Sequence, residues 1–103
     1  MPALNYLSSI LFSGIDAGDF LQNQLSADVL ALDDRESTFA CYCEPKGRVL
    51  ALMLVCRLAG AYQVILSRQL AQSVVDRLKI YRMRSKVEIE LLEQHRIFGT
   101  HTD

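Results

Sequence analysis

The sequence lacks the features that mark membrane-spanning, secreted and disulfide-linked proteins. Its longest uninterrupted apolar run, residues 49–56, has eight residues, whereas a membrane-spanning helix needs about 18 or more. No lysine or arginine precedes Arg35, so the basic start of a signal peptide is absent. The three cysteines have no disulfide-framework spacing, and in a reducing compartment such residues are usually small buried side chains. We therefore expect a cytoplasmic protein with no membrane contact.

Motifs that carry catalysis or bind metals are also missing. The sequence contains no H-E-x-x-H pair, no P-loop and no dinucleotide-binding glycine pattern. His95 and His101 have no serine or cysteine partner at an interpretable spacing. A metal site of Cys41, Cys43 and His95 is the alternative to core packing of the cysteines, which is favoured because no C-x-x-C pair is present. The sequence therefore assigns no catalytic residue and no metal ligand.

The composition is that of a folded protein, since half of the 103 residues are hydrophobic and 22 % are charged. We expect a single domain over residues 1–103. The apolar run at residues 10–12 predicts a buried strand that Gly14 closes. Asp16 then stands where it can cap a helix. The apolar face of that helix, at three- and four-residue spacing, is formed by Ala17, Phe20, Leu21 and Leu25.

Three further strands, joined by short turns, are predicted at residues 38–44, 49–58 and 62–66. The continuous apolar character of the second indicates a central strand covered on both faces. Ser67 can cap a second helix, whose predicted apolar stripe consists of Leu70, Val74, Leu78 and Tyr81. The last predicted strands lie near residues 87–91 and 95–99. The expected fold class is α+β, a mostly antiparallel sheet with two main helices packed against it.

The net charge of −1 conceals a strong asymmetry along the chain. Residues 1–45 carry one basic and seven acidic side chains, whereas residues 46–86 carry nine basic side chains and one acidic side chain. Such a chain can present a basic surface to an anion, although solvated charges that face acidic neighbours within the fold are the more common arrangement. Direct nucleic-acid binding is not expected, because the domain is slightly acidic overall and Tyr81 alone stands among the basic residues as a stacking aromatic.

Three sequence blocks together resemble the N-terminal part of the YgfZ family of folate-binding proteins. Residues 14–17 (GIDA) run into residues 20–29 (FLQNQLSADV), and two later blocks are residues 45–51 (PKGRVLA) and 81–87 (YRMRSKV). Each block is weak alone, but the three stand in the family's order and spacing over roughly residues 10–91. Ser26 and Asn23 replace the family's usual threonine and glycine.

The resemblance implies a fold like that of the glycine-cleavage aminomethyltransferase, with tetrahydrofolate bound in a central funnel. It also implies a role in making or repairing iron–sulfur clusters, including the cluster of a tRNA-thiolating enzyme, so iron–sulfur proteins are the implied partners. The family's K-G-C-x-x-G-Q-E motif, which lies beyond this region in longer members, is absent. We therefore expect this chain to be an N-terminal fragment of a protein two to three times longer, with a folate site that needs the missing part.

Six residues are candidates for the folate site: Asp28, Lys46, Gly47, Arg48, Tyr62 and Arg84. The Asp28 carboxylate can accept hydrogen bonds from a pterin or, as is more common, from backbone amides of the next turn. Lys46 and Arg48 flank Gly47 at a hairpin turn, where cations can hold an anionic ligand tail or can simply be solvated. Arg84 alternates with Arg82 and Lys86, which in an extended segment places all three on one face towards a glutamate tail. Tyr62 can stack on a ring system or belong to the core.

Two other functions compete with folate-dependent iron–sulfur maintenance. The first is aminomethyl transfer itself, but the stretch at residues 65–76 lacks the transferases' asparagine, and Asp76 is displaced by two residues, roughly 200° around a helix, from the expected aspartate. The second is a ligand-free interaction module that docks a partner through the charged segment at residues 77–86.

Overall fold

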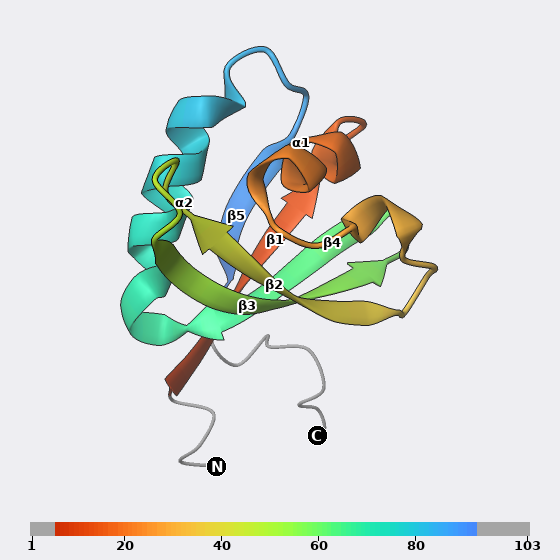
Figure 1. Ribbon diagram of the computed structural model, residues 1–103. Coiled ribbons are helices and arrows are strands. Elements are labelled where there is room, and N and C mark those ends of the chain that lie inside the picture. The colour runs from red at the N-terminus through yellow and green to blue at the C-terminus, as the bar shows by residue number, and fades with distance from the viewer. Residues whose placement is uncertain (1–5, 93–103) are drawn as a thin grey trace.

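The chain folds into one antiparallel sheet with two helices, which confirms the predicted α+β class. The computed structural model describes residues 6–92. Along the chain the elements are β1 (Leu7–Ser13), α1 (Ala17–Gln24), the short 3-10 helix η2 (Val29–Ala31), β2 (Ser37–Cys43), β3 (Val49–Leu58), β4 (Ala61–Ser67), α2 (Arg68–Arg82) and β5 (Glu88–Leu92). The strands are hydrogen-bonded in the order β2-β3-β4-β1-β5, and each neighbouring pair is antiparallel (Figure 1). The first strand therefore lies inside the sheet, between β4 and β5.

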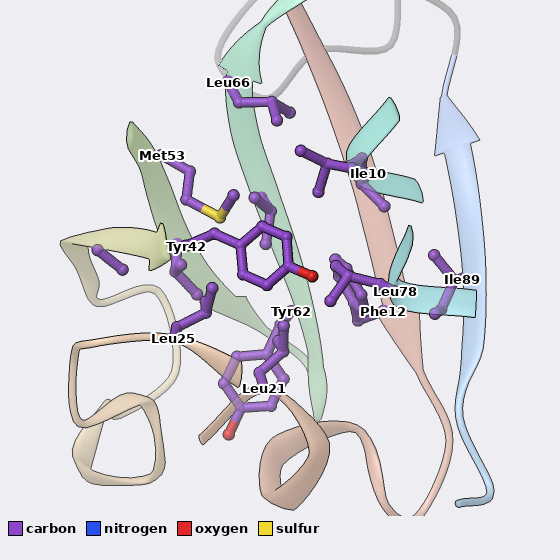
Figure 2. Close-up of a cluster of buried hydrophobic side chains, with 14 of the residues drawn as sticks. Ile10, Phe12, Leu21, Leu25, Tyr42, Met53, Tyr62, Leu66, Leu78 and Ile89 are labelled. Atoms are coloured by element: carbon purple, nitrogen blue, oxygen red, sulfur yellow. The ribbon is translucent and has the colours of Figure 1, made fainter. Parts of the chain in front are cut away.

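Both helices cover the same face of the sheet, and the core lies between them and the strands. Ile10 and Phe12 project from β1 into this layer, where the Phe12 ring lies 6.4 Å from that of Phe20 on α1, measured between centroids. Figure 2 shows Leu21, Leu78 and side chains of several strands converging on the same space. Such close packing is the main source of stability in a domain of this size. No helix in the described part of the chain is long and apolar enough to cross a membrane.

The opposite face of the sheet is covered only in part among the described residues. Cys56 of β3 is buried there beside Gln63, but the first half of the strand is exposed on that face. The prediction that β3 is covered on both faces is therefore wrong for that half. Ala51, Met53 and Val55 are buried against the helices, whereas Leu52, which points to the other face, is 60 % exposed. Phe39 on the neighbouring strand β2 is 71 % exposed on that face. The apolar run does not alternate because both faces of β3 are apolar, and only one of them has a helix layer above it.

The predicted stripe of α2 is correct at its centre and wrong at its ends. Val74 and Leu78 are buried, but Leu70 and Tyr81 are 38 % and 50 % exposed, and Ala71 and Val75 complete the buried face instead. The buried face is therefore shifted towards Ala71 and Val75, by roughly half a residue around the helix, relative to the prediction. Ser67 occupies the N-cap position but makes no side-chain capping bond.

A backbone closure ties the start of α1 to the segment that enters β5. Gly14 adopts a φ of 109°, a conformation that glycine adopts readily and other residues rarely do. This turn brings Asp16 to Lys86: the Asp16 N–H donates to the Lys86 carbonyl oxygen (3.1 Å), and the Lys86 N–H donates to Asp16 Oδ2 (2.7 Å). Asp16 is the N-cap of α1 but makes no capping bond there. Its predicted capping role is wrong because its carboxylate binds the β5 segment instead.

Two more predictions concern the loops. Asp28 stands at the N-cap of η2 without a side-chain capping bond, so the expected contact to backbone amides of the next turn is not made. The β3–β4 connection is a two-residue hairpin of Ala59 and Gly60, both at positive φ, the geometry that matches the twist of paired strands. The predicted strand at residues 95–99, and with it His95 of the alternative metal site, lies outside the described residues.

Candidate functional site: a basic groove beside helix α2

A groove runs along the C-terminal half of α2, bordered by the end of α1 and by the β2–β3 hairpin. It consists of three hollows of about 420, 220 and 250 Å³. The first and second share Asn23, Gln24 and Tyr81, and the second and third share Glu44, Pro45 and Arg77. The hollows therefore adjoin one another, and we call them together the basic groove.

Four cations line the basic groove: Lys46, Arg77, Arg82 and Arg84. None of the four forms an ion pair with a carboxylate of residues 6–92. Part of the positive charge of residues 46–86 is thus gathered on one side of α2, at four cations that form no ion pair with a described carboxylate. Unpaired cations in a depression create a positive potential that attracts anions.

The acidic side chains that border the groove are mostly engaged elsewhere. The Asp16 carboxylate accepts the Lys86 N–H, and Glu44 Oε2 accepts a hydrogen bond from Arg48 Nη2 at 3.2 Å. Asp19, exposed on the first turn of α1, is the remaining carboxylate among the residues that line the three hollows. The cations therefore outnumber the available carboxylates along the groove.

The β2–β3 hairpin places three of the six predicted site residues together. Gly47 adopts a φ of 94° at the tip, where its N–H donates to the Glu44 carbonyl oxygen at 2.8 Å. Lys46 and Arg48 are both exposed beside it, and Arg48 is held by Glu44. Of these three, Lys46 alone lines the basic groove. The two cations therefore flank the glycine turn as predicted, and Arg48 already forms an ion pair with Glu44.

The other three predicted residues lie apart from the hairpin. Arg84 lines the first hollow, whereas Lys46 lines the third. Arg82 belongs to α2, and the chain turns at Met83 (φ 44°), so Arg82, Arg84 and Lys86 do not alternate along an extended segment as predicted. Asp28 is exposed beside η2 and lines none of the three hollows.

Tyr62 is a core residue, which was the alternative to a stacking role. It is 3 % exposed, and its ring lies beneath α1, where the hydroxyl would be 3.0 Å from a Cβ at Gly18. The guanidinium carbon of Arg57 lies 5.8 Å from the ring centroid, within the range of a cation–π contact. Tyr62 therefore supports the packing of α1 on the sheet and offers no open ring face to a ligand.

Sequence reasoning did not identify Arg77 and Tyr81 as groove residues. Their spacing of four places them on the same face of α2, and both line the second hollow together with Tyr42. Burial raises the pKa of the Tyr42 hydroxyl above 10.0, and the neighbouring Arg77 guanidinium partly offsets this. The signal that could have found these residues is the i, i+4 spacing of a cation and an aromatic, but Tyr81 was assigned to the apolar stripe of α2.

Comparison with known proteins places the sequence among YgfZ relatives. The chain is 32 % identical over 90 residues to the tRNA-modifying protein YgfZ of Buchnera aphidicola, covering 87 % of this chain and 28 % of that protein. It is 36 % identical over 77 residues to the protein of the same name from Klebsiella pneumoniae, covering 75 % and 24 % of the two chains. The resemblance to the YgfZ family is confirmed. The chain spans about a quarter of the length of these two YgfZ proteins. No protein-family model matches the sequence.

The fold has a counterpart among solved structures. The glycine cleavage system aminomethyltransferase T from Bartonella henselae superposes with a TM-score of 0.80 at 20 % identity, covering 84 % of this chain and 24 % of that one. At this identity the similarity concerns the fold alone, and it confirms the aminomethyltransferase-like architecture expected of a YgfZ relative.

Proposed function

We propose that this chain forms part of a cytoplasmic, YgfZ-type protein that binds tetrahydrofolate and supports the assembly or repair of iron–sulfur clusters, and thereby tRNA modification. The observation that carries the proposal is the agreement of two independent similarities. The sequence is similar to proteins named tRNA-modifying protein YgfZ, and the fold is that of an aminomethyltransferase. Iron–sulfur proteins are the proposed partners, and no metal or catalytic role is proposed for residues of this chain.

In this proposal the β2–β3 hairpin contributes an anion-binding corner of the folate site. Lys46 is exposed and free of an ion pair with any described carboxylate, and the open backbone at Gly47 allows close approach because nothing lies within 4 Å of a Cβ built there. Arg48 can exchange Glu44 for a ligand carboxylate, since its side chain is 75 % exposed. Asp28, which is exposed beside η2, offers its carboxylate to the hydrogen-bond donors of the pterin. Arg84 lines a different hollow from Lys46, so its proposed contact with a glutamate tail requires the ligand to span the groove.

The aminomethyltransferase alternative finds no support in the region where the sequence argument placed it. Val74 is buried in the core, and Asp76 lies on the exposed side of α2, where its Oδ1 accepts a hydrogen bond from Gln72 Nε2 at 2.9 Å. Within the described chain, this part of α2 therefore presents no carboxylate towards the sheet.

The proposal is tested by titrating tetrahydrofolate into two proteins under anaerobic conditions. One is the 103-residue chain, and the other is the Klebsiella YgfZ protein in which the matching segment is replaced by this chain. Calorimetry should show saturable binding by the chimera, and substitution of Lys46 by alanine should weaken it, whereas the control Lys79→Ala on α2 should not. A chimera that is folded but binds no folate would refute the folate assignment. Folate binding without recovery of iron–sulfur enzyme activity in cells lacking YgfZ would refute the cluster-maintenance role. Aminomethyl turnover with a lipoyl carrier protein would favour the transferase.

A further inference from the structure

Helix α2 and the turn that follows it bring an aromatic ring and three guanidinium groups to one place. Arg77 and Tyr81 share a helix face, Arg82 ends the helix, and the turn at Met83 brings Arg84 to the first hollow. Tyr81 is 50 % exposed and lines both the first and the second hollow. An aromatic side chain on an exposed helix end, with cations on both sides in the sequence, has no role in the core of this fold.

The cations of this region have no acidic partner among the described residues, although Arg77 is hydrogen-bonded to the Tyr42 hydroxyl. None of Arg77, Arg82 and Arg84 pairs with a carboxylate of the described residues. Arg82 makes one long hydrogen bond, from Nη1 to the Val87 carbonyl oxygen at 3.4 Å. The facing carboxylate that remains available is that of Asp19. Like charges held together without partners raise the local potential, and an anionic ligand lowers that cost.

We propose that the basic groove binds single-stranded RNA. Phosphates would lie against Arg82, Arg84 and Lys46, and a base would stack on Tyr81. Three adjoining hollows suit an extended polymer that repeats its charge along the chain, rather than one compact anion. An acidic peptide offers the same charge but no planar group for Tyr81, so the aromatic ring favours the nucleic acid.

This inference goes beyond the folate proposal and departs from the expectation drawn from the sequence. Nucleic-acid binding was not expected because a single aromatic stood among many basic residues. In the structure that single aromatic lies at the junction of two hollows, between Arg77 and Arg84. The composition counts Tyr81 but does not show that it lies beside cations in a groove. Its position therefore favours RNA binding, although its number alone did not.

Fluorescence anisotropy tests the proposal with the 103-residue chain and a fluorescein-labelled oligouridylate of 12 nucleotides, at 50 and 200 mM KCl. We expect saturable binding that weakens with salt, since each phosphate contact to a single strand contributes about 0.7 to the logarithmic salt slope. Tyr81→Ala should weaken binding about tenfold with an unchanged slope, because it removes stacking and no charge. Arg84→Ala should weaken binding and lower the slope by about 0.7.

Lys79→Ala is the matched control for Arg84→Ala, because it also removes one positive charge from an exposed position, on α2, and Lys79 lines none of the three hollows. Circular dichroism and the thermal midpoint would verify that each variant is folded. Three results would overturn the proposal: no saturable binding at 50 mM KCl, equal losses for Lys79→Ala and Arg84→Ala, or binding that Tyr81→Ala leaves unchanged while poly-glutamate competes as well as RNA. The last result would assign the groove to acidic proteins. Because folate is absent from these titrations, their failure is separate from failure of the folate proposal.

Discussion

Replacing Gly14 with alanine is expected to lower the free energy of unfolding by roughly 2–6 kcal/mol. The φ of 109° at this position is one that L side chains rarely adopt, and such backbone strain costs about 1–3 kcal/mol. A Cβ would also overlap the carbonyl oxygen of Lys86, in the segment that enters β5. This contact is with backbone rather than with a flexible side chain, so relief requires the segment to move, and overpacking of that kind adds about 1–3 kcal/mol.

Urea unfolding followed by far-UV circular dichroism measures this loss, with Gly60→Ala as the matched control. Gly60 also has a positive φ, 85°, but nothing lies within 4 Å of a Cβ built there. The control should therefore show the strain cost without the overlap. Domains of this kind are stable by only about 5–15 kcal/mol, so Gly14→Ala should bring the chain close to unfolding. A Gly14→Ala loss no larger than that of Gly60→Ala would refute the closure of α1 onto the β5 segment.

Three further predictions test the stability of the fold: a backbone hydrogen bond, the two faces of β3, and a buried tyrosine. Asp16→Ala should lower the unfolding free energy by about 0.5–1.5 kcal/mol, because it removes the exposed hydrogen bond from the Lys86 amide to the Asp16 carboxylate, whereas Asp19→Ala on the same turn should change it by less than about 0.5 kcal/mol; chemical denaturation compares the two. Met53→Ala should cost about 2–5 kcal/mol and Leu52→Ala much less, and equal losses would mean that the outer face of β3 is covered after all. Burial raises the pKa of Tyr42 above 10.0, with a neighbouring guanidinium partly offsetting the shift, so the neutral hydroxyl is favoured in the folded state. The resulting stability is complete below about pH 10 and is lost as the pH rises through the folded-state pKa; unfolding from pH 8 to 11 should show this decline in the wild type and a shallower one in Tyr42→Phe.

The sequence predicted the order and class of the elements because these depend on local patterns. The spacing of Ala17, Phe20 and Leu21 suffices to identify the buried face of α1. The rotation of α2 was missed because Leu70 and Ala71 are both apolar, and only the sheet beneath decides which of them is buried. Likewise, the continuous apolar run of β3 does not reveal that one of its faces lacks a helix layer.

The candidate site was less predictable than the fold, for a physical reason. A motif such as Lys46-Gly47 consists of neighbouring residues and can be recognised in the sequence. The groove is formed by segments that are distant in sequence, such as those of Asn23 and Tyr81, and only the fold brings them together. Tyr62 illustrates the converse, since a strand aromatic equally suits a stacking platform or a core, and only its burial under α1 decides. Asp16 resembled a helix cap because its distant partner, the Lys86 amide, cannot be inferred from neighbouring residues.

The central place of β1 in the sheet also has a consequence for synthesis on the ribosome. Leu7 pairs with Ser67 and Ser13 pairs with Glu88, so β1 emerges well before both of its neighbours, β4 and β5. The hairpins β2–β3 and β3–β4 can form early from nearby residues, but β1, with its buried Ile10 and Phe12, stays without partners until β4 has been translated. Such long-range pairing slows folding and leaves apolar strand edges open meanwhile. A nascent chain of which only residues up to 60 have left the ribosome should therefore be a better chaperone substrate than one of which residues up to 92 have left it.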